Sequence, residues 1–273
     1  MLGASALVQA SWPRRSPATA ILLWQALGLA GGLAAIGTLV SLGLPGDHLG
    51  VARSLLHLGT VFPGAAFRFP VAFDMVSALP TLLLAFRITC LAAGLALLAH
   101  GDPKAPGALV VDYPTAAAYC LPGLRSRIVV LSVGTLELLG RGELAAVLAH
   151  ERAHLRERHD LVLLPFTALR RAFPRSVMCA DAHRAVALLI EMLADDRALR
   201  GRPARELVSA LVRFGTAGTC PAPAGALAAG QGDMAARVAR LLQPVRPLPA
   251  AASAAVCLTA GLLVAVTVAL LIV

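Results

Sequence analysis

The residues best suited to chemistry form one short motif, His150-Glu151-Arg152-Ala153-His154. On a helix, positions i and i+4 lie on one face, so both imidazoles can bind one Zn²⁺ while Glu151 projects beside the metal. Residues 143–156 contain no Gly or Pro, which favours an uninterrupted helix. The pattern therefore predicts a zinc site. The alternative is a charged helix surface that carries two incidental histidines.

A third zinc ligand must come from another element, because a catalytic zinc usually has three protein ligands and a water. Glu191 is the best candidate, on a helix that we predict over 181–200 with Asp181 as its cap. Glu191 and Asp195 are spaced i and i+4, so they share a face. One carboxylate can bind the metal while the other accepts a hydrogen bond from a ligand imidazole.

Two alternatives to this ligand set remain open. His159 and His183 are weaker candidates for the third ligand, one just beyond the motif helix and one in the first turn of the next helix. The acidic residues could instead form a solvated face paired with Arg197 and Arg200.

The composition is that of a membrane protein. Hydrophobic residues make up 58% of the chain, charged residues 14%, and the mean hydropathy is +0.76. The net charge of +9 does not indicate a nucleic-acid partner, because no basic run is interleaved with the few aromatic residues. The five cysteines show no C-x-x-C spacing, so we expect no disulfide framework and a reducing compartment.

Long uncharged stretches predict three membrane-spanning helices. The expected organisation is a short N-terminal segment over 1–16, a first transmembrane helix over 17–45, an extracytoplasmic loop over 46–74, a second transmembrane helix over 75–100, a zinc domain over 101–249 and a third transmembrane helix over 250–273. Arg14 and Arg15 precede the first span, and most other arginines lie between the second and third. This asymmetry predicts a cytosolic N-terminus and a cytosolic zinc domain.

The zinc domain is predicted to be mostly helical, with a small β-sheet or hairpin. Strands are expected over Ala108–Val111, Ala116–Leu121 and Arg127–Leu131. Helices are expected over 132–139, 142–157, 160–171, 181–200, 203–214 and 233–242. The strand Arg127–Leu131 lies just upstream of the motif helix, so we expect it to be an edge strand that binds extended substrate. Its alternative role is to pack the core.

The segments His150–Asp160 and Glu191–Asp195 resemble the M56 membrane metallopeptidases, a family that includes the metalloprotease domain of the BlaR1/MecR1 β-lactam sensors. The stretch 117–123 is similar to the hairpin that precedes the catalytic helix in that family. The resemblance covers roughly Ile21 to Pro249. It implies an α+β gluzincin domain with His150, His154 and Glu191 on zinc, Glu151 as general base and Asp195 behind a ligand.

The resemblance implies a membrane-embedded zinc endopeptidase that hydrolyses peptide bonds at the cytosolic membrane face, in regulatory or signalling proteolysis. M48 (HtpX-like) quality-control peptidases share both motifs and are the nearest enzyme alternative. A non-catalytic zinc-binding membrane regulator is the alternative outside enzymes. The expected partners are a protein or peptide substrate and the lipid bilayer, with a homo-oligomer or a separate sensor partner left open. The sequence does not include the sensors' penicillin-binding domain, so the resemblance does not extend to β-lactam sensing.

Overall fold

The computed structural model describes residues 2–43, 108–121, 128–217, 231–243 and 246–272. This part of the chain is mostly helical, with one small mixed sheet, which agrees with the predicted fold class. The predicted loop over 46–74 and the predicted second transmembrane helix over 75–100 lie outside the described residues. A short helix α1 (Leu2–Gln9) and a 3-10 turn η1 (Trp12–Arg15) lead into the first long helix.

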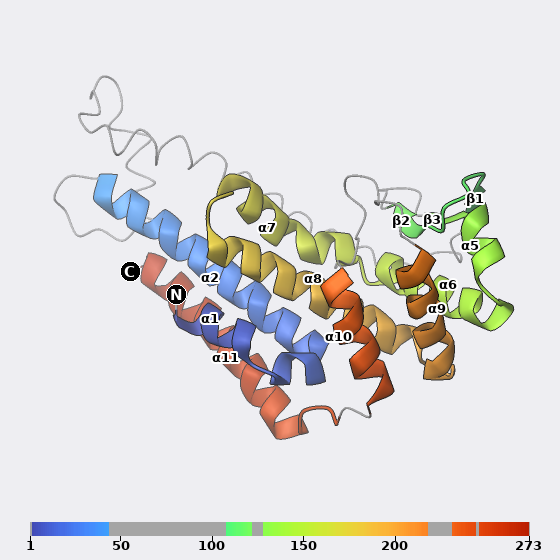
Figure 1. Ribbon diagram of the computed structural model, residues 1–273. Coiled ribbons are helices and arrows are strands. Elements are labelled where there is room, and N and C mark those ends of the chain that lie inside the picture. The colour runs from blue at the N-terminus through green and yellow to red at the C-terminus, as the bar shows by residue number, and fades with distance from the viewer. Residues whose placement is uncertain (1, 44–107, 122–127, 218–230, 244–245, 273) are drawn as a thin grey trace, which may run out of the picture.

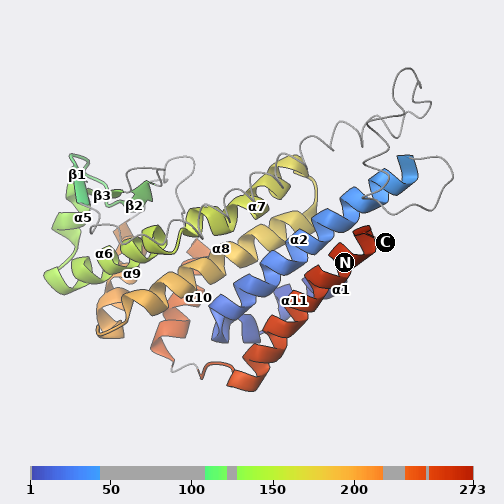
Figure 2. The ribbon, with the colours of Figure 1, turned by 180° about the vertical axis from the view of Figure 1, so that it is seen from behind.

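Among the described residues, two helices are long and apolar enough to cross a membrane, and they indicate a membrane protein. They are α2 (Pro17–Gly43, 27 residues) and α11 (Ala250–Ile272, 23 residues). About 20 residues suffice to cross the hydrocarbon core. The two helices lie side by side along one flank of the molecule (Figures 1 and 2). They occupy the positions of the first and third predicted spans.

The two long helices differ in what surrounds them. Leu258, Leu262 and Leu270 on α11 are exposed, as expected for side chains that face lipid. On α2, by contrast, Ile21 and Trp24 are buried in a core shared with residues 166–190 of the predicted zinc domain. The first half of α2 is therefore a packing partner of the domain as well as a candidate membrane span.

Three strands form the sheet: β1 (Ala108–Val111), β2 (Ala118–Leu121) and β3 (Ile128–Ser132). Their order is β1-β3-β2, with β1 parallel and β2 antiparallel to β3. The three predicted strands are thus confirmed, but the prediction that 127–131 forms an edge strand is wrong. The apolar run at 129–131 is fully buried, and a strand buried on both faces belongs between neighbours. The edges of the described sheet are β1 and β2.

A group of hydrogen bonds between the backbone before β2 and two buried hydroxyls fixes where β2 starts. The backbone N–H of Ala117 donates to the hydroxyls of Ser132 and Thr135, at 2.9 and 2.8 Å, and the Thr135 hydroxyl donates back to the Ala117 carbonyl. Ser132 also accepts from the Thr135 N–H and so caps α5 (Val133–Leu138), the helix predicted over 132–139. These hydrogen bonds fix the position of β2 relative to α5.

The remaining helices of the described chain include the helix that carries the H-E-x-x-H motif and the helices that pack around it. They are α6 (Arg141–Arg156), α7 (His159–Ala172), α8 (Val177–Ala198), α9 (Ala204–Ala217) and α10 (Gln231–Leu242). Helix α8 begins four residues before its predicted start, so Asp181 is not its cap. Ser176 is the cap instead, because its side chain accepts from the Cys179 N–H, and Asp181 pairs with Arg184 within the helix.

Helix α8 lies at the centre of this arrangement. Its residues Leu189 and Ile190 pack against the first half of α2, and Phe166 of α7 contacts the Trp24 ring edge-on. Gln25 of α2 also donates to the Val162 carbonyl of α7 at 2.7 Å. Helix α6, which carries the H-E-x-x-H motif, also packs on α8. Helix α8 therefore contacts both the motif helix and the candidate membrane helix α2 (Figure 1).

Candidate metal centre

The motif residues lie on α6, and the face they share is buried. His150 is 6% exposed and His154 is 3% exposed, so neither belongs to a solvated helix surface. Glu143 stabilises the start of this helix, because its carboxylate accepts from the Gly140 N–H at 2.8 Å. The alternative of two incidental surface histidines is therefore wrong for this helix.

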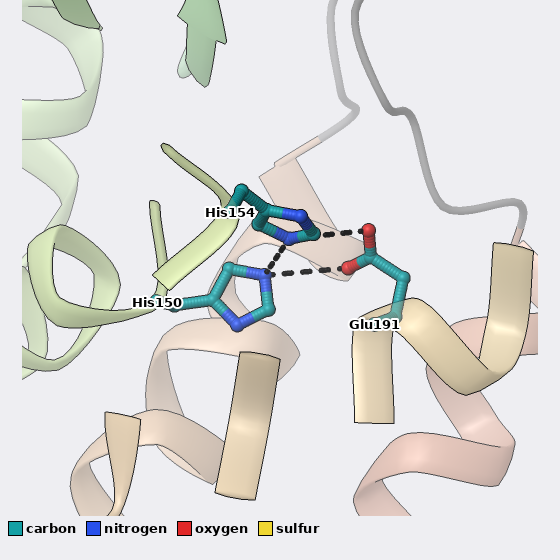
Figure 3. A group of neighbouring side chains, drawn as sticks. All are labelled: His150, His154 and Glu191. Atoms are coloured by element: carbon teal, nitrogen blue, oxygen red, sulfur yellow. Dashed lines mark hydrogen bonds and ion pairs between the residues drawn. The ribbon is translucent and has the colours of Figure 1, made fainter. Parts of the chain in front are cut away.

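Glu191 of α8 completes a group of three facing side chains (Figure 3). The Nε2 atoms of His150 and His154 are 3.0 Å apart, and they lie 3.3 and 3.4 Å from the two Glu191 carboxylate oxygens. Ligands held about 2.0–2.1 Å from a tetrahedral zinc are separated by about 3.3 Å. The donor types and their spacing therefore fit one zinc ion.

Asp195 lies one turn further along α8 and contacts the imidazole of His150 at Nδ1, the ring nitrogen that does not face Glu191. Its Oδ1 is 2.9 Å from Nδ1 of His150, and the Asp195 side chain is 1% exposed. Once Nε2 is deprotonated, an acceptor at Nδ1 leaves the Nε2 lone pair directed at His154 and Glu191, which is how ligand imidazoles are oriented in metal sites. Burial works to lower the pKa of His150, but the adjacent Asp195 and Glu191 carboxylates raise it to about 9, so a metal must displace the Nε2 proton of this imidazolium when it binds.

Arg237 of α10 is a residue of the site that the sequence analysis missed. Its Nε and Nη2 donate to the two Asp195 oxygens at 2.8 and 2.6 Å, and its Nη1 lies 2.8 Å from Glu191. A signal was present in the sequence. Met234, Val238 and Leu241 form the apolar face of α10, and Arg237 falls on that same face. A charge on a buried stripe requires a buried partner.

The two acidic residues are therefore not a solvated face. Glu191 is 6% exposed, and Arg197, the partner considered for it, pairs instead with Glu157. Burial alone would raise the pKa of Glu191, but Arg237 and His154 hold it well below its usual range. Burial lowers the pKa of His154 to about 3. The cluster thus offers a carboxylate and a neutral imidazole, both of which are suitable zinc ligands.

Glu151 follows His150 on α6, the helix that packs on β2. Burial raises the pKa of the Cys120 thiol on β2, and the charge of nearby Glu151 raises it further. Burial raises the pKa of Glu151, and the His150 charge opposes this shift only in part. A carboxylate with a raised pKa is a stronger base when it is ionised, which suits a group that accepts a proton near neutral pH.

The weaker ligand candidates lie outside this group. Nδ1 of His159 is 3.0 Å from Nδ1 of His154, so His159 lies behind a ligand candidate and not among the metal-facing atoms. His183 is part of no metal-ligand group within the described residues, and burial lowers its pKa. The structure thus brings together His150, His154 and Glu191, with Asp195 behind them.

Residues 87–192 match the model of Peptidase family M48, and the matched stretch includes the motif and Glu191. No curated protein and no solved structure matches the chain. With the geometry of the three side chains, the match shows that the chain carries a metallopeptidase domain. The two motifs of this chain are shared by M48 peptidases, which are the nearest enzyme alternative to M56. The match therefore favours that alternative over M56, which is a different family.

Proposed function

We propose that this protein is a membrane-embedded zinc endopeptidase whose ligands are His150, His154 and Glu191. The observation that carries the proposal is the buried group of three side chains, whose ligand atoms all lie within 4.8 Å of one another. A structural zinc would more often be closed by four Cys or His ligands. Three ligands leave a coordination position for water or substrate.

When bound, zinc supplies Lewis-acid activation of a water and of the scissile carbonyl. Glu151 takes the proton of the attacking water and delivers it to the leaving amine nitrogen. Asp195 holds His150 in the tautomer that leaves Nε2 free for the metal. Arg237 holds both Asp195 and Glu191, so the two carboxylates keep their places when substrate enters.

The M48 match favours membrane quality-control proteolysis of the HtpX-like kind. Regulatory proteolysis, which the M56 resemblance implies, is the second candidate, supported by the residues His150–Asp160 and Glu191–Asp195. Packing of α8 against α2 supports an active site close to the bilayer. The arginine asymmetry supports the cytosolic face.

The test uses the full chain in lipid nanodiscs, as wild type and as the Glu151→Gln variant. Glutamine keeps the size of the side chain but cannot act as a base. We expect both proteins to bind one zinc and only the wild type to cleave casein, used here as a loosely folded reporter. Zinc bound by both with no cleavage of casein or of membrane reporters would support a non-catalytic regulator instead.

A further inference from the structure

His159, the first residue of α7, is a buried histidine that the proposed mechanism does not use. It is 1% exposed, and its ring packs edge-on against His154 with the ring centroids 4.8 Å apart. The contact joins the two Nδ1 atoms at 3.0 Å. Since Nε2 of His154 faces His150 and Glu191, the His154 ring lies between the metal-facing atoms and His159.

Two further residues continue the contacts behind His159. Its Nε2 faces Oε2 of Glu157 at 3.5 Å, and Oε1 of Glu157 accepts a hydrogen bond from Nε of Arg197. Glu157 follows the end of α6, and Arg197 lies near the end of α8. The contacts therefore run from a ligand candidate on α6, through α7, to the helix that carries Glu191.

The backbone holds His159 in this place through a strained residue. Arg158, between α6 and α7, has φ 51° and ψ 48° and is the one non-glycine residue with positive φ in the described part of the chain. A left-handed conformation is unfavourable for such a residue, so the surrounding contacts must maintain it. The carbonyl of Arg158 accepts from the N–H groups of Leu161 and Val162. This tight turn directs His159 back onto α6.

Two facing Nδ1 atoms at this distance can share only one proton, so one ring must donate and the other must accept. We propose that His159 is a positioning residue for the zinc ligand His154, accepting at its Nδ1 the Nδ1 proton of His154. His154 then presents the lone pair of Nε2 to the metal. His159 carries its own proton on Nε2, on the side of Glu157. Partners behind ligand imidazoles are usually carboxylates, carbonyls or waters, and here an imidazole takes that place.

The matched pair of variants is His159→Asn and His159→Gln. Asparagine carries its amide oxygen as far from Cβ as the Nδ1 atom that it replaces, so it can still accept from His154. Glutamine carries the same group one carbon further out, where Nε2 lay. Zinc affinity is measured on the purified apo-protein in detergent by competition with a chelator, and thermal unfolding of each apo-variant checks the fold.

We expect the His159→Asn variant to bind zinc within about threefold of wild type, and the His159→Gln variant to lose about 10–100-fold. Equal losses in both variants, or no loss in His159→Gln, would overturn the proposal and leave His159 as a packing residue. The inference rests on the proposed zinc site, which has its own control. A wild type that binds no zinc, or a His154→Ala variant that still binds one equivalent, would refute the site itself.

Discussion

At the residue scale, we expect Asp195 to position a zinc ligand without binding zinc itself. Its carboxylate contacts the Nδ1 atom of His150 and is removed from the metal-facing atoms. Asp195→Ala should therefore weaken zinc affinity about 10–100-fold, while His154→Ala should abolish stoichiometric binding. Chelator competition on both variants measures the difference. Wild-type zinc affinity in Asp195→Ala would show that the contact does not orient His150.

Arg237 is the cation that pairs with the two buried carboxylates of Glu191 and Asp195. Replacing it with methionine keeps much of the volume but leaves Glu191 and Asp195 without their counter-charge. Breaking a buried ion pair in this way should lower the free energy of unfolding of the apo-protein by about 3–5 kcal/mol.

Zinc provides the internal control for this variant. A bound dication would offset part of the unpaired negative charge, so the loss of stability should be smaller with zinc than without it. Arg240→Met is the matched control, because Arg240 pairs with the more exposed Asp196. Denaturant unfolding with and without metal tests both. Equal losses in the apo and zinc-loaded Arg237→Met protein would argue against a metal beside Glu191.

At the element scale, we expect β2, and not β3, to be the strand that binds an extended substrate. It is an edge of the described sheet, and Cys120 places it next to Glu151. In an antiparallel pair, alternate backbone N–H groups point away from the partner strand. An extended peptide could pair with those groups and present its carbonyl near Glu151.

A proline scan over Ala118–Leu121 tests this use of β2. Proline removes an N–H donor without adding charge. We expect alternate positions to lose cleavage while zinc stays bound, and the others to lose stability as well because they pair with β3. Cleavage and metal content falling together at every position would show that β2 serves only the core.

At the scale of the whole molecule, α2 and α11 begin at the same end. The Ser16 side chain, just before α2, accepts from the Leu248 N–H, just before α11, at 3.0 Å. Arg15 donates to the Arg246 carbonyl in the same region. If both helices cross the bilayer, the chain must cross back an odd number of times between them. A single span over 75–100, as predicted from the sequence, would satisfy this requirement.

Labelling of single cysteines tests this topology. In a background without the native cysteines, Lys104→Cys should be shielded from a membrane-impermeant reagent in whole cells, and Gly50→Cys should be labelled. Permeabilised cells control for accessibility, because both positions should then react. The reverse pattern in whole cells would place the metallopeptidase domain outside.

The sequence by itself determined the parts of the site that depend on local spacing. His150 and His154, like Glu191 and Asp195, are i and i+4 pairs, and helix geometry alone places each pair on one face. The sequence also predicted the two apolar helices α2 and α11 and the approximate extents of the three strands. Each of these features follows from a continuous run of residues.

Only the tertiary structure decided how these elements meet. Arg237 reaches Asp195 from a helix 42 residues further along the chain, and no local pattern specifies that pairing. The central position of β3 results from backbone pairing with both β1 and β2, which are separate segments of the chain. His159 became a neighbour of His154 through the left-handed turn at Arg158. In each case the deciding energy is long-range burial and charge pairing, which spacing along the chain does not encode.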